Sequence, residues 1–298
     1  MNYNWIRPPP PPDGVERKTW ADPIKTPTHL GCCFAVSKKN FDRLGRYDPG
    51  LDIWGCENLE LSFKTWMCGG RVELIPCSHV GHMYRPSFPY SWGSDGQFTL
   101  QRNCLRVADV WLDEYKKVYH ERISDLQKSL DIGDTRDRKA IRDRLQCRPF
   151  EWYAKEIYPE LYIPLNTSTT GRIASAVDPA LCLSRDVHWP SLNQSVLVTS
   201  CNSQDQKQHF FLSKEGHIRR DQGCLVYDRE TNQVVMRYCE HADGHWIYTP
   251  DDTLMAQEVG QCITLSPDKK KVFIAACNAN NPSQKWKWPR KSVVFQAR

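Results

Sequence analysis

The apolar positions between residues 51 and 77 follow a helical pattern that stops at two glycines. Because residues three and four apart share one face of a helix, the pattern predicts an amphipathic helix from about Glu57 to the Gly69-Gly70 stop. Its apolar side consists of Leu59, Leu61, Phe63, Trp66 and Met67. The flanking residues predict a strand within 25–36, a helix start near Ser37, and a short strand over 71–77.

A second helical pattern covers residues 103–124 and has the periodicity of a helix that packs against a core. Its apolar positions are Leu105, Val107, Val110, Trp111, Tyr115, Val118 and Tyr119. Residues 134–147 predict a charged helix, and the polar run NTSTTG at 166–171 predicts a linker.

The second half of the chain repeats a unit that opens and closes on cysteine. The three units are Cys182–Cys201, Cys224–Cys239 and Cys262–Cys277, and each ends in a β-branched run. An aromatic residue follows nine positions after each closing cysteine, at Phe210, Tyr248 and Trp286. Short units of this kind cannot bury a face alone, so they must pack on one another. The internal cysteine pairs predict three disulfides, each worth about 3 kcal/mol in the chain-entropy model.

These repeats resemble the ricin-type β-trefoil, a threefold lectin fold, over about residues 171–294. The resemblance places an Asp after each opening Cys-Leu pair and an Asn before each Gln-x-aromatic pattern, and no repeat of this chain keeps both. Asp228 and His241 of the middle unit are the remaining candidates for a glycan ligand. The alternative is a purely structural role for the trefoil.

Composition narrows the possible partners and compartment. The net charge of +5 is too mild to indicate nucleic acid, so no nucleic-acid partner is expected. No apolar run is long enough to cross a bilayer, and no signal-peptide core follows Met1. The 13 cysteines nevertheless favour an oxidising compartment. This conflict predicts that a targeting segment is missing from the chain.

Five motifs of the first half resemble the polypeptide N-acetylgalactosaminyltransferases. They are WGCEN, TWMCGG, IPCSHVGH, WLDEY and CRPFEWY. The resemblance implies a Golgi enzyme that transfers GalNAc from UDP-GalNAc to Ser or Thr of Ser/Thr-rich acceptor peptides, with Mn²⁺ and retention of configuration. It also implies a C-terminal ricin-type lectin domain.

The resemblance assigns roles to individual residues around the start of the Glu57 helix. Backbone N–H groups and the positive dipole end at a helix start favour anionic or hydroxyl-rich ligands. The implied roles are catalytic for Glu57 and Asn58, substrate-binding for Trp54, Tyr84, Arg85 and Tyr90, and metal-binding for His82. The alternative is that Trp54 belongs to the core, Glu57 caps the helix, and His82 is a surface histidine.

The metal site predicted in this way is incomplete. Mn²⁺ on a diphosphate needs several hard ligands, and the family supplies two from an Asp-x-His upstream of WGxEN. The triplets at 186–188 and 243–245 lie inside the trefoil repeats, so we interpret them as coincidence. The 53 residues before Trp54 are too few for a doubly wound nucleotide fold.

The cysteines of the first half depart from the family at two positions. Cys32 and Cys56 stand where the family has glycine, and we hypothesise that Cys56 bonds with Cys32 or Cys33. The resemblance pairs Cys68 with Cys147 and leaves Cys77 as an odd thiol.

The predicted architecture is an α/β partial glycosyltransferase of GT-A type, without its N-terminal nucleotide-binding half, followed by an all-β ricin-type β-trefoil. The expected parts are a Pro-rich segment (1–24), the C-terminal part of a catalytic domain (25–160), a linker (161–170) and the trefoil (171–298). The predicted function is that of the transferase family, with no turnover by this chain alone. The alternative is a non-catalytic protein, a truncated isoform or pseudoenzyme, that binds carbohydrate or glycopeptide or acts as a modulator.

Overall fold

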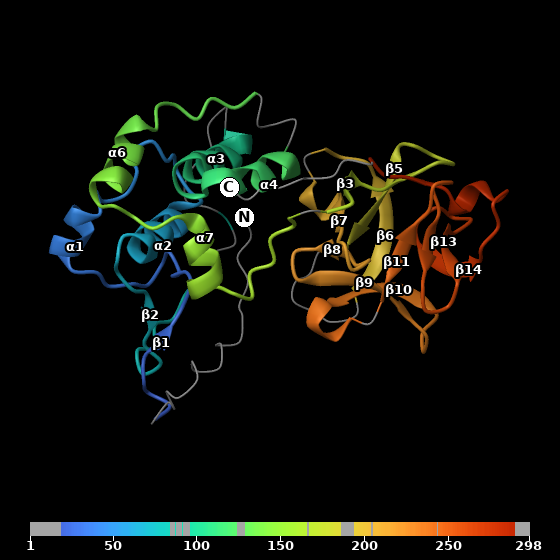
Figure 1. The fold of residues 1–298 in the computed structure, drawn as a ribbon, viewed down its shortest axis with the longest axis horizontal. Coiled ribbons are helices and arrows are strands. Elements are labelled where there is room, and N and C mark those ends of the chain that lie inside the picture. The colour runs from blue at the N-terminus through green and yellow to red at the C-terminus, as the bar shows by residue number, and fades with distance from the viewer. Residues whose placement is uncertain are drawn as a thin grey trace. The chain divides into compact units, whose positions relative to one another are not determined.

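The computed structural model describes residues 19–83, 87, 91, 96–123, 129–165, 167–185, 194–203, 205–242 and 244–289. The chain divides into two compact units, Met1–Leu161 and Tyr162–Arg298. Figure 1 shows helices in the first unit (blue to green) and strands in the second (yellow to red). Within the described ranges, no helix is both long enough and apolar enough to cross a bilayer.

The first unit is mainly helical. Its α-helices are α1 (Lys38–Arg43), α2 (Glu57–Met67), α3 (Thr99–Trp111), α4 (Lys116–Arg122), α6 (Arg136–Arg144) and α7 (Phe150–Trp152). Shorter helical turns cover Gly96–Phe98, Asp113–Tyr115 and Tyr153–Ile157. The strands β1 (Ile24–Lys25) and β2 (Glu73–Leu74) form one antiparallel pair.

The strand predicted within 25–36 is wrong beyond Lys25. Residues 26–36 are irregular, and the His29 N–H donates to the Ser62 Oγ of α2 at 3.1 Å instead of to a neighbouring strand. A helix side chain therefore satisfies the backbone that a sheet would otherwise pair.

The predicted starts of α1 and α2 are confirmed. The Ser37 hydroxyl accepts from the Asn40 N–H at 3.2 Å, which is the bond of a helix N-cap. Helix α2 begins at Glu57 and ends at Met67. Gly69 then adopts φ +85°, a conformation that glycine provides at low cost.

The helical pattern over 103–124 is interrupted at Asp113, so the structure has α3 and α4 in place of one helix. Asp113 adopts φ +47°. Its carboxylate accepts from the Phe150 N–H at 2.7 Å and from the Arg142 guanidinium at 2.9 Å. These tertiary contacts hold a backbone conformation that the local pattern does not predict.

An aromatic cluster and a disulfide close the core of the first unit. The ring centroids of Phe63 and Tyr153 lie 5.1 Å apart, and Phe150 lies 5.6 Å from each. The predicted Cys68–Cys147 disulfide is present. It joins the end of α2 to the segment before α7, and therefore links residues far apart in the sequence.

Two ion pairs are buried in the same unit. Lys64 contacts Glu60 at 2.7 Å one turn away on α2, and Arg106 of α3 contacts Asp48 at 2.6 and 3.0 Å. Burial raises the pKa of Glu60 and lowers the pKa of Lys64, because a low-dielectric environment disfavours either charge alone. Each charge of the pair therefore depends on the other.

The second unit is built from antiparallel strands around one apolar core. One sheet has the order β15-β4-β5-β6-β10-β9-β8-β7-β3 and the other β11-β12-β13-β14. The bounds are β3 (Thr169–Arg172), β4 (Ala174–Ser175), β5 (Leu181–Arg185), β6 (Gln194–Ser200), β7 (His209–Leu212), β8 (Ile218–Arg220), β9 (Gly223–Asp228), β10 (Gln233–Tyr238), β11 (Trp246–Tyr248), β12 (Leu254–Ala256), β13 (Gln261–Leu265), β14 (Val272–Ala276) and β15 (Trp286–Lys287).

The three predicted repeats form three equivalent hairpins. The pairs β5–β6, β9–β10 and β13–β14 each place the opening cysteine opposite the residue two before the closing cysteine, as in Cys182↔Thr199, Cys224↔Arg237 and Cys262↔Ala275. The predicted disulfides Cys182–Cys201, Cys224–Cys239 and Cys262–Cys277 are all present. The shared register explains why the cysteines recur.

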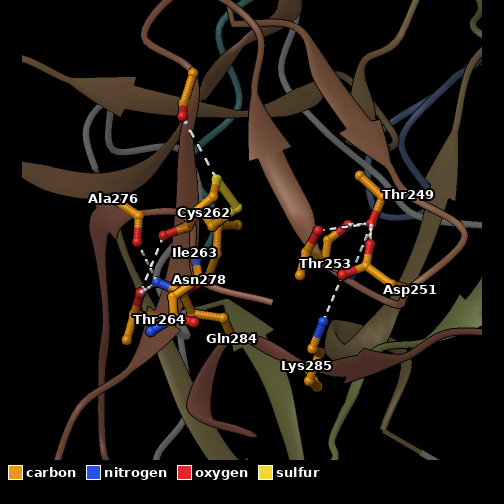
Figure 2. The surroundings of a disulfide bond; sticks show 12 residues. Thr249, Asp251, Thr253, Cys262, Ile263, Thr264, Ala276, Asn278, Gln284 and Lys285 are labelled. Carbon is orange, nitrogen blue, oxygen red and sulfur yellow. Dashed lines mark hydrogen bonds and ion pairs between the residues drawn. A yellow bond between two sulfur atoms is a disulfide. The ribbon is translucent and has the colours of Figure 1, made fainter. Parts of the chain in front are cut away.

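In the first and third hairpins a buried glutamine, Gln208 or Gln284, holds the end of the hairpin. Gln284 donates to Thr264 Oγ1 at 3.0 Å and to the Ala276 carbonyl at 2.9 Å, and it accepts from the Asn278 N–H at 2.7 Å (Figure 2). Gln208 makes the two corresponding backbone bonds in the first repeat, to the Ser200 carbonyl and from the Asn202 N–H, and donates to the Thr199 hydroxyl of the closing strand β6. The Gln of each Gln-x-aromatic pattern is thus a structural residue.

The middle repeat differs from the sequence prediction. The aromatic residue equivalent to Trp286 is Trp246, seven positions after the closing cysteine, and not Tyr248. The Trp246 indole N–H donates to the Leu225 carbonyl at 2.7 Å, as that of Trp286 does to Ile263 at 3.0 Å. The connection from the closing cysteine to this tryptophan is two residues shorter than in the third repeat, so a fixed spacing of nine residues selects Tyr248 instead.

We expect Lys64→Met to destabilise the first unit by about 3–5 kcal/mol at pH 7, because it leaves the Glu60 carboxylate buried without its cation. The pKa of Glu60 in the folded state is already raised. Stability should therefore be lost as the pH rises through that pKa and regained toward pH 4–5. Hydrogen exchange of the α2 amides reports this unit separately. A Glu60→Gln/Lys64→Met double variant should remove the pH dependence, and an equal loss at pH 5 and pH 8 would contradict the explanation.

We expect Gln284→Ala to destabilise the second unit by about 1–3 kcal/mol, since the buried Thr264 hydroxyl, the Asn278 N–H and the Ala276 carbonyl all lose their partner. Gln233→Ala is the matched control, because Gln233 is exposed on β10, and it should change stability by less than about 0.5 kcal/mol. Exchange of the β13 and β14 amides measures both. Equal effects of the two substitutions would refute the structural role.

Candidate functional site at the amino end of helix α2

The loop before α2 has an unusual backbone. Ile53, Gly55 and Cys56 all have positive φ, at +47°, +110° and +68°. Ile53 is β-branched and Cys56 carries a Cβ, so both are held in a conformation that costs free energy. A Cβ added at Gly55 would lie 2.5 Å from Leu100 Cδ1 of α3. The loop therefore needs glycine at 55 and tertiary contacts at its neighbours.

Helix α3 supplies those contacts through a buried amide. The Asn103 side chain, 0% exposed, accepts from the Asp52 N–H at 3.0 Å and donates to the Asp52 carbonyl at 2.7 Å. It also donates to the Trp54 carbonyl at 3.3 Å. Arg102 adds a 2.8 Å ion pair to Asp52. The loop that carries Trp54 is thus fixed on α3.

A disulfide fixes the next residue of the loop. Cys56 is bonded to Cys104 of α3, so the hypothesis that Cys56 bonds with Cys32 or Cys33 is wrong. The physical reason is that α3 packs along α2 and brings Cys104 beneath the helix start. Cys32, Cys33 and Cys77 are free, which agrees with the prediction of an odd thiol at Cys77.

Asn103 and Cys104 were not identified from the sequence as site residues. The sequence feature that could have identified them is an amide and a thiol on the apolar side of the predicted 103–124 helix. A polar group at such a position must find a partner, but the sequence does not say which loop provides it.

Trp54 lies half exposed at the amino end of α2, formed by residues 53–58 and called the α2 mouth below. Its side chain is 49% exposed and that of Ile53 is 53% exposed, so the alternative that Trp54 belongs to the core is wrong. A large aromatic ring kept at the surface by a rigid loop is suited to contact a sugar face or a peptide.

Glu57 and Asn58 form the first turn of α2. Glu57 Oε2 accepts from the Gly55 N–H at 2.8 Å, which fits the capping alternative for this residue. The Asn58 side-chain oxygen accepts from the Leu59 N–H at 3.1 Å. Both acceptors face backbone N–H groups at the positive end of the helix, where negative charge is favoured.

The bend at residues 29–34 borders the same mouth. A Cβ added at Gly31 would lie 3.3 Å from Glu57 Oε1, so the backbone of Gly31 passes close to the carboxylate. Burial lowers the pKa of the neighbouring His29, while Glu57 acts in the opposite direction. His29 is thus mainly neutral at pH 7 and contributes little charge to the site.

The other residues predicted for the site lie on the segment after β2. His82 and Met83 are exposed, whereas Tyr84, Arg85 and Tyr90 lie outside the described residues. In the described ranges no three His, Cys, Asp or Glu side chains are grouped closely enough to hold a metal ion. The described residues do not by themselves fit a Mn²⁺ site.

The lectin candidates lie in the middle repeat of the second unit. Asp228, at the end of β9, is buried, accepts from the Glu230 N–H at 3.1 Å and pairs with Arg237 at 3.2 Å. A hydrogen bond from Thr231 is the main cause of its lowered pKa. These contacts lie within its own hairpin. The side chain of His241 and the triplet at 186–188 lie outside the described residues, and His245 of the other triplet contacts Glu258 at 2.8 Å.

Two family models match the chain. One, described as "Ricin-type beta-trefoil lectin domain", matches residues 169–286. The other, described as "N-terminal domain of galactosyltransferase", matches residues 14–86, which include the α2 mouth.

Curated relatives match almost the whole chain. It is 42% identical over 290 residues to polypeptide N-acetylgalactosaminyltransferase 5 of Caenorhabditis elegans, covering 97% of this chain and 46% of that protein. It is 37% identical over 285 residues to polypeptide N-acetylgalactosaminyltransferase 3 of Homo sapiens, covering 91% and 44%. The chain therefore spans less than half the length of these relatives.

A solved structure extends the likeness to three dimensions. The crystal structure of GalNAc-T7 with UDP, GalNAc and Mn²⁺ aligns with a TM-score of 0.67 and 29% identity, over 92% of this chain and 50% of that one. Given this agreement, the resemblance seen in the WGCEN and CRPFEWY motifs is confirmed. The chain belongs to the polypeptide N-acetylgalactosaminyltransferase family.

Proposed function

We propose that this chain carries the sugar- and acceptor-contacting part of a transferase that moves GalNAc from UDP-GalNAc to Ser or Thr. The observation that supports this most directly is Trp54, 49% exposed on a loop that Asn103 and the Cys56–Cys104 disulfide hold rigid. Exposing a large aromatic ring on an ordered loop forfeits burial free energy, so a ligand that covers the ring recovers it.

The surrounding groups suit the same ligand. The α2 amino end attracts the negative charge of a nucleotide sugar or the hydroxyl oxygens of a sugar ring. Asn58 offers an amide nitrogen for a hydroxyl group, and Glu57 offers the carboxylate oxygen that is not used by the Gly55 N–H. As the family resemblance implies, we propose that Tyr84 contacts the acceptor peptide and that Arg85 and Tyr90 contact the diphosphate.

The donor side needs more than these residues. We propose that His82 is one ligand of a Mn²⁺ site whose remaining ligands, in the family, come from an Asp-x-His. A diphosphate-bound Mn²⁺ requires several such ligands to stabilise the leaving group. We further propose that the 298 residues correspond to the C-terminal part of a GT-A-type catalytic domain plus the lectin domain, and that the protein acts in the Golgi lumen.

The Trp54 contact can be measured by binding. We expect Trp54→Ala to weaken the affinity of the 298-residue chain for a GalNAc-bearing, Ser/Thr-rich peptide about tenfold, on the order of 1.4 kcal/mol, by removing the aromatic platform. Trp20→Ala is the matched control, since Trp20 is a 70% exposed tryptophan of the same unit, and it should leave the affinity unchanged. Isothermal titration calorimetry measures both.

Two outcomes would count against the proposal. Equal affinities of the two variants would exclude Trp54 from the ligand site. An affinity that falls with Asp228→Ala but not with Trp54→Ala would favour the alternative of a non-catalytic glycopeptide-binding protein that uses its trefoil.

Turnover provides the second test. We expect no transfer when these 298 residues alone are mixed with UDP-GalNAc, Mn²⁺ and a Ser/Thr-rich peptide, because His82 cannot hold the metal–diphosphate by itself. Release of UDP and mass spectrometry of the peptide measure the reaction. Turnover that His82→Ala abolishes would overturn this expectation.

A further inference from the structure

Two of the free cysteines are neighbours in sequence and in space. Cys32 and Cys33 are both exposed, and their sulfur atoms lie 3.1 Å apart. Cys77 is the remaining free cysteine and is also exposed. The first unit therefore presents one vicinal dithiol and one separate single thiol.

The local fold explains why the two sulfurs meet. In an extended strand, successive side chains point to opposite faces. Residues 31–33 instead form a bend, and its flanks are held together by the His29 and Phe34 rings, whose centroids lie 4.6 Å apart. The hydrogen bond from the His29 N–H to Ser62 fixes this bend on α2.

The pair has an asymmetric chemistry. The Cys33 thiol donates a hydrogen bond to the Cys32 sulfur, and this bond is the main cause of the raised pKa of Cys33. The Cys32 sulfur is thus the acceptor of the pair, and its own S–H is not used in this contact.

We propose that Cys32 and Cys33 are a redox modification site that forms a reversible vicinal disulfide with small-molecule disulfides such as oxidised glutathione. The Cys32 thiolate attacks one sulfur of oxidised glutathione, forms a mixed disulfide and releases one glutathione thiolate. The Cys33 sulfur, after losing its proton to solvent, attacks the Cys32 sulfur and displaces the second glutathione. The two cysteines lose two electrons and two protons in total, and one oxidised glutathione becomes two reduced molecules.

The position of the dithiol connects it to the α2 mouth. Gly31, the residue before the pair, lies against Glu57. Closing the two sulfurs into a ring fixes the bend that carries Gly31. Oxidation of the pair changes thiol content and mass, which can be measured whether or not the chain takes part in GalNAc transfer.

The test uses the full chain with Cys77→Ser, so that only the pair is free. In the reduced protein, N-ethylmaleimide should label two cysteines. After oxidised glutathione it should label none, and peptide 26–38 should lose two hydrogen atoms and carry no glutathione. Dithiothreitol should restore both labels. In the reduced state phenylarsine oxide, a trivalent arsenical that bridges two thiols, should bind one to one.

The control is the Cys33→Ser/Cys77→Ser chain. It should retain one glutathione as a mixed disulfide and lose phenylarsine oxide binding at the concentration that saturates the Cys77→Ser protein. Stable glutathione adducts on the pair, a disulfide between two chains, or full labelling after oxidation would each overturn the proposal.

Discussion

The side-chain amide of Asn103 is the contact on which the candidate site depends. It is fully buried and bonds to both backbone groups of Asp52 and to the carbonyl of Trp54. A buried amide without partners costs several kcal/mol, so its satisfaction selects one conformation of the loop. That conformation exposes Trp54 and places Glu57 at the start of α2. The geometry of the mouth therefore originates in α3 and not in the motif that contains it.

The second unit uses the same device. Gln208 and Gln284 are buried amides that bind the backbone before and after a closing cysteine. In both units a short disulfide-linked element is fixed by a side-chain amide from a neighbouring segment. Directional hydrogen bonds specify a loop conformation that apolar packing alone would leave open. The three hairpins share their backbone register even in the middle repeat, where Trp246 is the aromatic residue and Gly244 takes the place of the glutamine.

The cysteines of the first unit lie in two different environments. Cys56 has a left-handed backbone at φ +68°, a conformation that costs a non-glycine residue roughly 1–2 kcal/mol. Its disulfide to Cys104 constrains the unfolded chain and offsets that cost. Cys32 has no such partner on α3, so it meets Cys33 instead. Cys56 is thus part of a structural disulfide, whereas Cys32 and Cys33 are free and exposed.

The sequence alone determined the elements whose signals are local. Helical periodicity and a serine cap fixed α1 and α2, and the cysteine repeat fixed the three trefoil hairpins with their disulfides, because these depend on residues close in the chain. Only the tertiary structure decided the break at Asp113, the Cys56–Cys104 pairing, the role of Trp246 and the exposure of Trp54. Each of these depends on a partner tens of residues away, and sequence periodicity records which face of an element is buried without recording what it is buried against.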